Sequence, residues 1–246
     1  MLKFGLIGKK LGHSFSKKYF SEKFEREGIQ DAQYELYELP EAQELKSLLK
    51  SEPELVGLNV TVPFKQDVIP LLDELEGTAA KIGAVNTIRI NGGKTKGFNT
   101  DYIGFKSTLE EFYPPSERKQ ALVLGTGGAA KAVWAALDAL QVPYKSVSRN
   151  PNQAKEELTY GQLTPTLFQA YNLIINTTPL GMYPHTDSLP DLPYNSLTGQ
   201  HYLYDLVYNP EQTLFLKEGA LAGAQICNGL DMLYRQADAA WAIWNS

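Results

Sequence analysis

The first hundred residues alternate between strand-like and helix-like patterns of apolar positions. Strand patterns lie at residues 2–8, 32–39 and 57–62, and helix patterns end at Gly28, span 41–49 and follow the third strand to about Leu75. Asn91-Gly92-Gly93, between the segments 84–90 and 94–99, is typical of a hairpin turn. Strands that alternate with helices favour parallel βαβ units, so this part predicts an α/β fold with a mainly parallel sheet.

A second series of strands and helices begins near Asp101. Strands are predicted at residues 121–124, 144–149, 172–178, 202–208 and 224–229, with an amphipathic helix after the first of them. Leu230 to Trp244 has apolar residues at helical spacing and predicts a last helix. The two series predict two domains that meet near Asn99 to Asp101.

The third predicted strand ends in a run of polar groups. Apolar positions in residues 57–62 alternate with Asn59 and Thr61, which is typical of a half-buried strand whose second face carries an amide and a hydroxyl. Pro63 has no N–H to donate and ends the strand, and Lys65 follows it. Either the strand simply reaches the surface, or its end forms a substrate pocket.

A glycine turn follows the first strand of the second series. Gly125-Thr126-Gly127-Gly128-Ala129-Ala130 has the G-x-G-x-x-G/A spacing, lies after an apolar strand and opens a helix. Small residues there let backbone N–H groups approach a pyrophosphate at the helix N-terminus. The alternative is a tight strand-to-helix turn without a ligand.

The end of the next strand indicates which dinucleotide would bind. NAD enzymes place an acid there to bind the ribose 2′-hydroxyl. This chain has Ser148 and Arg149, and Arg149 forms a small basic group with Lys145 and Lys155. Because Arg attracts a 2′-phosphate and an acid would repel it, the sequence favours NADP over NAD. The alternative is an ordinary surface arginine at a strand end.

Small polar residues stand at several strand ends of the first half. Ser14 and Ser16 follow the first strand, Thr61 and Lys65 follow the third, and Asn86 precedes the hairpin. Ligands of open parallel sheets bind at the carboxyl ends of the strands, and these groups suit a small polyhydroxylated anion. The alternatives are that a serine caps the next helix, that Asn86 is a turn residue, and that Asp101 is the N-cap of a helix over 102–111.

Composition and charge narrow the class of protein. Fourteen Lys and Arg balance fourteen Asp and Glu in residues 1–100, so the whole net charge of −5 comes from residues 101–246, and we expect no nucleic-acid partner. One cysteine and three scattered histidines predict neither a disulfide framework nor a metal site. No apolar run has spanning length, so we expect no membrane partner and a cytoplasmic protein.

Eight motifs together resemble the shikimate/quinate dehydrogenase family. In chain order they are HSFSK, NVTVPFKQ, GAVNT, GFNTDYIGF, GTGGAAKA, NTTPLGMYP, YDLVYNP and GLDMLYRQA. The resemblance runs from Lys3 to Trp244 and implies NADPH-dependent, reversible reduction of 3-dehydroshikimate to shikimate. It also implies a substrate domain over 1–100, a Rossmann-type NADP domain over 101–229, and a C-terminal helix within 230–246 that packs back on the first domain. The active site would lie in the cleft between the two domains.

The resemblance assigns substrate and catalytic residues by position. Lys65 and Asp101 would be the catalytic pair, and Ser14 and Ser16 would bind the substrate carboxylate. The remaining substrate residues would be Thr61, Asn86 and Gln236 at its hydroxyls, Tyr208 near its carboxylate, and Asn59 in the pocket lining. The cofactor residues would be Gly125, Thr126, Gly127, Gly128, Ala129, Ser148, Arg149, Thr177, Gly229 and Met232, with no metal.

Several positions depart from the family pattern. Lys17 replaces a usual proline, Thr126 replaces a usual alanine, and Gln153 stands where a second basic residue is expected for NADP. Two other functions stay open from the residues: an NAD-using quinate/shikimate dehydrogenase, against which Ser16 argues, and a non-catalytic ligand sensor, against which the Lys65 and Asp101 pair argues. A monomer or homodimer is expected.

Overall fold

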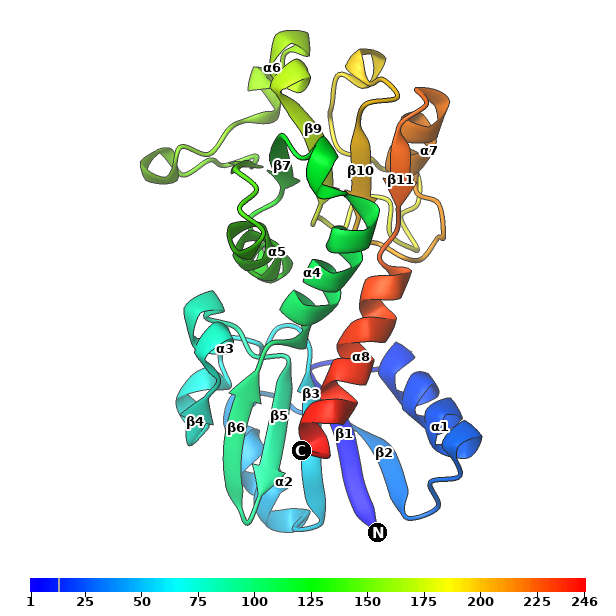
Figure 1. The fold of residues 1–246 in the computed structure, drawn as a ribbon. Helices are drawn as coiled ribbons and strands as arrows, with labels where there is room; N and C mark the ends of the chain where they lie inside the picture. The colour runs from blue at the N-terminus through cyan, green and yellow to red at the C-terminus, as the bar shows by residue number, and fades with distance from the viewer. Residues whose placement is uncertain (13) are drawn as a thin grey trace. The chain divides into compact units, whose positions relative to one another are not determined.

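The computed structural model describes residues 1–12 and 14–246 (Figure 1). His13 of the HSFSK motif lies outside the described residues. The chain divides into two compact units, residues 1–100 with 237–246 and residues 101–236. Each unit has a sheet and a core of its own.

The sheet of the first unit has six strands in the order β2-β1-β3-β5-β6-β4. Their bounds are β1 (Leu2–Gly8), β2 (Ala32–Glu38), β3 (Leu55–Val60), β4 (Glu74–Leu75), β5 (Thr87–Asn91) and β6 (Lys94–Phe98). Only β5 is antiparallel to its neighbours, β3 and β6, so the sheet is mainly parallel, as the sequence predicts. Gly92 and Gly93 have φ of 56° and 78°, the backbone that a tight hairpin turn requires, and the predicted hairpin is confirmed.

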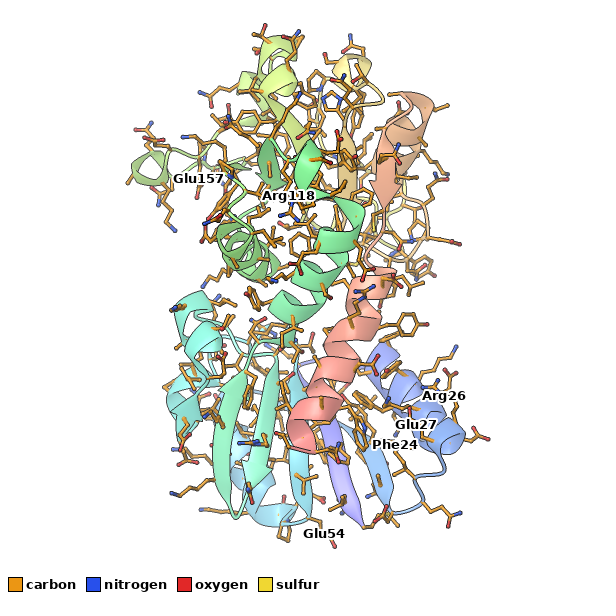
Figure 2. All side chains as sticks on the ribbon, in the orientation of Figure 1. Phe24, Arg26, Glu27, Glu54, Arg118 and Glu157 are labelled. Carbon is orange, nitrogen blue, oxygen red and sulfur yellow. The ribbon has the colours of Figure 1, made fainter. Side chains whose placement is uncertain are left out.

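Both faces of this sheet are buried. One face packs against α1 (Phe15–Glu27) and the last turns of α8 (Leu230–Trp244) in an aromatic-rich cluster that includes Phe4, Phe20 and Trp244. On α1, Phe24 points toward the sheet and Arg26 away from it (Figure 2). The other face, with Ile7, Leu58 and Val60, packs against α2 (Leu45–Ser51) and α3 (Gly77–Ile82).

The segment after β3 differs from the sequence prediction in two ways. The strand ends at Val60, two residues earlier than predicted, and Val62 beyond it is 71% exposed. Both faces of the strand are buried, because even Asn59 on the second face is only 6% exposed. The helix expected as far as Leu75 is absent: turns lead into a short 3₁₀ segment, and β4 and α3 follow. Phe64 and Val68 do have helical spacing, and one N–H···O bond of 3.0 Å links their backbones, but Pro70 lacks the N–H that would continue a helix.

The sheet of the second unit is entirely parallel and has five strands in the order β11-β10-β9-β7-β8. Their bounds are β7 (Gln120–Leu124), β8 (Tyr144–Val147), β9 (Tyr171–Asn176), β10 (Tyr202–Asp205) and β11 (Gln225–Cys227). Counted within the unit, the order is 2-1-3-4-5, one of the two common strand orders of doubly wound sheets. The order reverses between β7 and β9, which is where ligands bind in such sheets.

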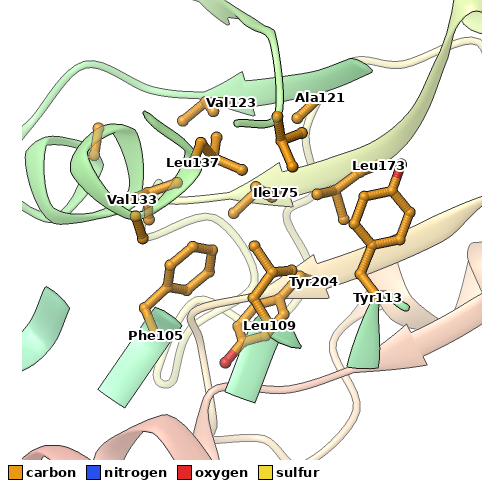
Figure 3. Packing of buried hydrophobic residues seen from close by; sticks show 13 residues of the cluster. Phe105, Leu109, Tyr113, Ala121, Val123, Val133, Leu137, Leu173, Ile175 and Tyr204 are labelled. Carbon is orange, nitrogen blue, oxygen red and sulfur yellow. The ribbon is translucent and has the colours of Figure 1, made fainter. Parts of the chain in front are cut away.

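Alternate residues of β7 and β9 enter two different cores. Val123 and Ile175 pack with Phe105 of α4 (Thr100–Phe112) and Val133 of α5 (Gly128–Ala139), as Figure 3 shows. Leu122, Leu124 and Ile174 pack on the opposite face, where α6 (Pro165–Ala170) and α7 (Leu214–Leu221) lie. These strands therefore read as continuous apolar runs, as expected for a parallel sheet covered on both sides.

Two helices of the second unit, α6 and α7, are short, and neither is predicted from the sequence. The helices α6 and α7 begin after Thr164 and Thr213, whose side chains accept from the N–H groups of Leu167 and Leu216. Helix α4 begins at Thr100, so Asp101 lies in its first turn and the prediction of Asp101 as N-cap is wrong.

Six 3₁₀ segments complete the described elements: η1 (Ala42–Glu44), η2 (Ile69–Leu71), η3 (Pro115–Glu117), η4 (Gln153–Lys155), η5 (Tyr160–Gln162) and η6 (Tyr194–Ser196).

Candidate functional site

The carboxyl ends of β1 and β3 bring the first group of candidate residues to one edge of the sheet. Ile7 and Val60 are paired in parallel, and Thr61 N donates to Ile7 O at 3.0 Å. Lys65 is placed by two anchors: the preceding Phe64 side chain is buried in the core, and Lys65 O accepts from Val85 N at 2.7 Å. Ser14 and Ser16, at the start of α1, come after β1 in the chain.

The two serines have different surroundings. Ser14 is the N-cap of α1, and its Oγ accepts from Lys17 N at 3.3 Å, so the capping interpretation of Ser14 is correct. Because that bond uses Ser14 as an acceptor, its hydroxyl proton stays available to a ligand. Ser16 lies in the first turn of α1 and forms a hydrogen bond with Tyr34, which opposes the rise in the Tyr34 pKa caused by burial.

A network of buried polar side chains lies behind these residues. Tyr34 OH donates to Asn59 Oδ1 at 2.7 Å, and Asn59 Nδ2 donates to Thr87 Oγ1 at 3.2 Å. The Thr87 hydroxyl lies 3.1 Å from that of Thr100 and 3.3 Å from Asn86 Oδ1. Asn59 therefore contributes to the sheet interior, with its amide bonded to side chains of β2 and β5.

Asn86 connects this network to the start of α4. Its Oδ1 accepts from Thr100 N at 2.6 Å, and its Nδ2 donates to Thr100 Oγ1 at 3.0 Å. Asn99 Nδ2 donates to Ala84 O at 3.0 Å and holds the preceding residue. The turn that carries Asp101 is thus attached to the hairpin strand through side-chain amides. Lys65 belongs to the first unit and Asp101 to the second.

The glycine turn lies at the switch point of the second sheet. Gly125 has a φ of 101°, which favours glycine, and a Cβ there would lie 2.8 Å from Thr177 Oγ1. Thr177 N and Oγ1 donate to Leu124 O at 3.0 and 2.7 Å, so the first residue after β9 is fastened to the end of β7. The turn and Thr177 therefore share one edge of the sheet.

The start of α5 has the features of a pyrophosphate site. Gly127 is its N-cap and makes no side-chain capping bond, so no side chain competes for the first N–H groups of this 12-residue helix. A Cβ at Gly127 or Gly128 would meet no atom within 4 Å, so open space lies beside the backbone here. Thr126 is half-buried and Ala129 exposed. This donor set and space fit a dinucleotide phosphate.

The segment after β8 presents one exposed arginine. Arg149 lies two residues after the end of β8, and its positive charge opposes the rise in the Tyr160 pKa that burial causes. Ser148 Oγ accepts from Asn150 N at 3.2 Å and forms a local turn. Both lysines of the predicted basic group with Arg149 have other partners. Lys145 forms an ion pair with Glu156, and the Lys155 ammonium lies 5.8 Å from the centroid of the Trp134 ring.

The ends of β9 and β10 carry a buried polar cluster that the sequence prediction missed. Asp205 is fully buried and accepts from Asn176 Nδ2 at 3.0 Å, Val207 N at 3.0 Å and Thr213 Oγ1 at 2.6 Å. Burial raises the pKa of Asp205 to about 6. The available signal was a polar residue at the end of an apolar strand, the same signal that identified Thr61 and Lys65.

This cluster fixes two loops that hold candidate residues. Asn176 Oδ1 accepts from the N and Oγ1 of Thr178 at 3.0 and 2.6 Å, and so shapes the loop that contains Thr177. Asp205 holds the beginning of the loop that contains Tyr208, which is 37% exposed.

The remaining candidates lie at or near α8. Gly229 N donates to Val207 O at 3.2 Å and directly precedes the helix. Met232 packs on the core of the second unit, and Gln236 is 9% exposed with its Nε2 donating to Leu233 O.

Residues 1–12 and 14–246 lack two further kinds of feature. They contain no group of three or more His, Cys, Asp or Glu side chains that is arranged to hold a metal ion. None of their helices is both long and apolar enough to cross a membrane.

Comparison with known proteins identifies relatives along the whole chain. Residues 6–88 match the family model described as "Shikimate dehydrogenase substrate binding domain". The chain is 38% identical over 255 residues to "Shikimate dehydrogenase (NADP(+))" of Methanococcus maripaludis strain C6, covering 98% of this chain and 90% of the relative. A relative with the same name from Clostridium beijerinckii is 38% identical over 250 residues, with 98% and 91% covered.

Solved structures agree with these relatives. A chorismate mutase/shikimate 5-dehydrogenase fusion protein from Clostridium acetobutylicum has a TM-score of 0.88 at 38% identity, covering 100% of this chain and 91% of that one. Shikimate 5-dehydrogenase from Thermus thermophilus, solved in complex with NADP(H) and shikimate, has a TM-score of 0.86 at 30% identity, with 99% and 93% covered. Relatives above 30% identity span nearly all of the sequence, and the chain belongs to the shikimate dehydrogenase family.

Proposed function

We propose that this protein is an NADP-dependent shikimate dehydrogenase, which reversibly reduces 3-dehydroshikimate to shikimate in aromatic amino acid biosynthesis. The observation that carries the proposal is the 38% identity to NADP(+)-dependent shikimate dehydrogenases over 98% of the chain. The glycine turn of the second unit and the polar strand ends of the first support it, because one suits a dinucleotide and the other a small hydroxylated anion.

The second unit would hold NADP. The pyrophosphate would bind at Gly125, Thr126, Gly127, Gly128 and Ala129, where the N–H groups at the start of α5 have room for it. Arg149 and Ser148 would hold the 2′-phosphate, since Arg149 is exposed at the end of β8 with no acid beside it in sequence. The loops and helix that border the sheet edge would contact the rest of the cofactor through Thr177, Gly229 and Met232.

The first unit would supply most of the substrate contacts. Ser14 and Ser16 would bind the carboxylate, and the Ser14 hydroxyl is suited to donate to it because its acceptor side is used by Lys17 N. Hydroxyl groups would be bound by Thr61, Asn86 and Gln236, with Tyr208 near the carboxylate and Asn59 behind the pocket. This set would recognise the shape and hydroxyl pattern of the ligand, because each hydroxyl would meet a polar side chain.

Lys65 and Asp101 would perform the proton chemistry. Bound NADPH supplies a hydride to the ketone carbon, and the carbonyl oxygen must then gain a proton to become the alcohol. An ammonium beside that oxygen stabilises the negative charge that develops in the transition state and can donate the proton. Asp101, in the first turn of α4, would orient the ammonium and the substrate hydroxyl.

The function is tested by following reduced nicotinamide absorbance with shikimate and quinate, each with NADP and NAD. We expect the highest kcat/KM with shikimate and NADP. Preference for quinate and NAD would replace the proposal with the quinate dehydrogenase alternative, and no turnover in any combination would favour the sensor.

The role of Lys65 is tested by Lys65→Met, which keeps stem volume and removes the charge. We expect kcat to fall by about 10²–10⁴, the usual contribution of general acid–base catalysis, with a smaller change in KM. Lys81→Met, at an exposed position of α3, is the matched control and should keep the wild-type kcat. If Lys65→Met and Lys81→Met had equal kcat, Lys65 would have no catalytic role.

We also propose small-molecule partners only, a cytoplasmic location, and a monomer or homodimer. Light scattering after size-exclusion chromatography measures the oligomeric state directly, and a stable higher oligomer would contradict this part.

A further inference from the structure

The buried polar network of the first unit is unusual for the middle of a sheet. Tyr34, Asn59, Asn86, Thr87 and Thr100 are each 6% exposed or less. Replacing the whole network by apolar side chains of similar shape can be nearly neutral for stability, because the net gain from a buried hydrogen bond is small, whereas removing one member leaves its partners unpaired. A fully paired network does, however, hold its members in one arrangement. The residues attached to this network are therefore held in a fixed position.

Thr87 stands at the centre of the network. Its hydroxyl accepts from Asn59 Nδ2 at 3.2 Å and can donate to Thr100 Oγ1 at 3.1 Å or Asn86 Oδ1 at 3.3 Å. The side chain is fully buried on β5, between the strand that leads to Lys65 and the helix that carries Asp101. One hydroxyl thus joins β3 to the first residue of α4.

Thr100 transmits this placement to its neighbour. Its backbone N and its hydroxyl are both bonded to Asn86, at 2.6 and 3.0 Å, so the first residue of α4 is held by main chain and side chain together. Asp101 is the next residue in the same helical turn, and its backbone position follows from that of Thr100. A misplacement of about 1 Å at a reacting group can reduce a rate about 10²-fold.

We propose that Thr87 is a positioning residue for the reaction, which acts through Asn86 and Thr100 to set the location of Asp101. Its hydroxyl contributes to the rate without contacting cofactor or substrate. The inference rests on the proposed function, because it takes Asp101 to be a catalytic residue.

The test is Thr87→Val, which removes the hydroxyl and keeps the shape of a buried strand residue. We expect kcat for shikimate oxidation to fall about tenfold or more, while KM for NADP stays unchanged because the cofactor residues lie in the other unit. Thr87→Ser keeps the hydroxyl and should recover most of kcat.

Thr95→Val is the matched control. Thr95 is 4% exposed on β6 of the same sheet, and its hydroxyl donates to Asp73 Oδ2 at 2.8 Å, near the hairpin end. It should lose stability as Thr87→Val does and keep the wild-type kcat. If Thr87→Val does not fold, Tyr34→Phe removes the donor that holds Asn59 and should lower kcat with unchanged KM for NADP.

A folded Thr87→Val enzyme with wild-type kcat would overturn the inference, as would equal losses of kcat in Thr87→Val and Thr95→Val. Wild-type kcat in Tyr34→Phe would overturn it where that variant is used. If the wild-type protein did not oxidise shikimate, the proposed function would fail first, and the inference would lose its premise with it.

Discussion

The buried carboxylate of Asp205 predicts an unusual dependence of stability on pH. Its three hydrogen-bond donors are an amide, a backbone N–H and a hydroxyl, all of them neutral. They oppose the effect of burial only in part, and the pKa of Asp205 rises from 3.8 to about 6. The folded protein therefore binds this proton more tightly than the unfolded chain does.

The sign and size of the effect follow from proton linkage. Between about pH 4 and pH 6 the folded state holds the Asp205 proton and the unfolded state does not, so the free energy of unfolding falls as pH rises through this window. Since one pKa unit corresponds to 1.36 kcal/mol, the contribution lost is roughly 3 kcal/mol. Above about pH 6 both states are ionised at this position and the contribution stays constant.

Asp205→Asn isolates this contribution, because an amide of the same size does not titrate. Urea unfolding of wild type and variant at pH 4, 5, 6 and 7 gives the difference in unfolding free energy at each pH, in which the other groups largely cancel. We expect wild type to lose stability relative to the variant by roughly 3 kcal/mol between pH 4 and pH 7.

Asp187→Asn, at an exposed position of the same unit, reports the effect of removing one carboxylate from the surface. A difference between wild type and Asp205→Asn that stays constant with pH would refute the reasoning. A difference that grew in favour of wild type would mean that the three donors outweigh burial.

Three further outcomes are expected. Arg149→Asp should raise KM for NADP with less change in kcat, by an amount corresponding to about 1.5–3 kcal/mol for a charged hydrogen bond, and an unchanged KM would remove Arg149 from the 2′-phosphate site. Gly125→Ala should lower the melting temperature and the thermal shift caused by NADP, because its φ of 101° and the 2.8 Å approach to Thr177 exclude a methyl group; a normal shift would contradict this. Replacing Ser14 and Ser16 together by Ala should raise KM for shikimate and cost about 1 kcal/mol of stability for the lost N-cap; lost stability with normal KM would leave capping as their whole role.

Sequence patterns predicted the regular elements best where one pattern runs the length of an element. The last helix has the predicted bounds, Leu230–Trp244, because its apolar positions repeat at helical spacing throughout. The first strand, Leu2–Gly8, is also as predicted. The prediction of a helix in the segment 63–75 is wrong, because Phe64 and Val68 are buried at helical spacing although the backbone there forms turns. Spacing records which residues are buried, and a turn can bury the same residues as a helix.

The candidate residues show the same division between local pattern and tertiary pairing. The glycine turn, Lys65 after its strand and the absence of an acid beside Arg149 are properties of short stretches, and the sequence by itself determined them. The hydrogen bonds of Asp205 to Asn176 and of Thr87 to Thr100 join residues that are far apart in the chain. Such pairs depend on strand order and on which strand end faces which helix. A polar residue at a strand end is therefore visible in the sequence, whereas its partner is decided only when the sheet has formed.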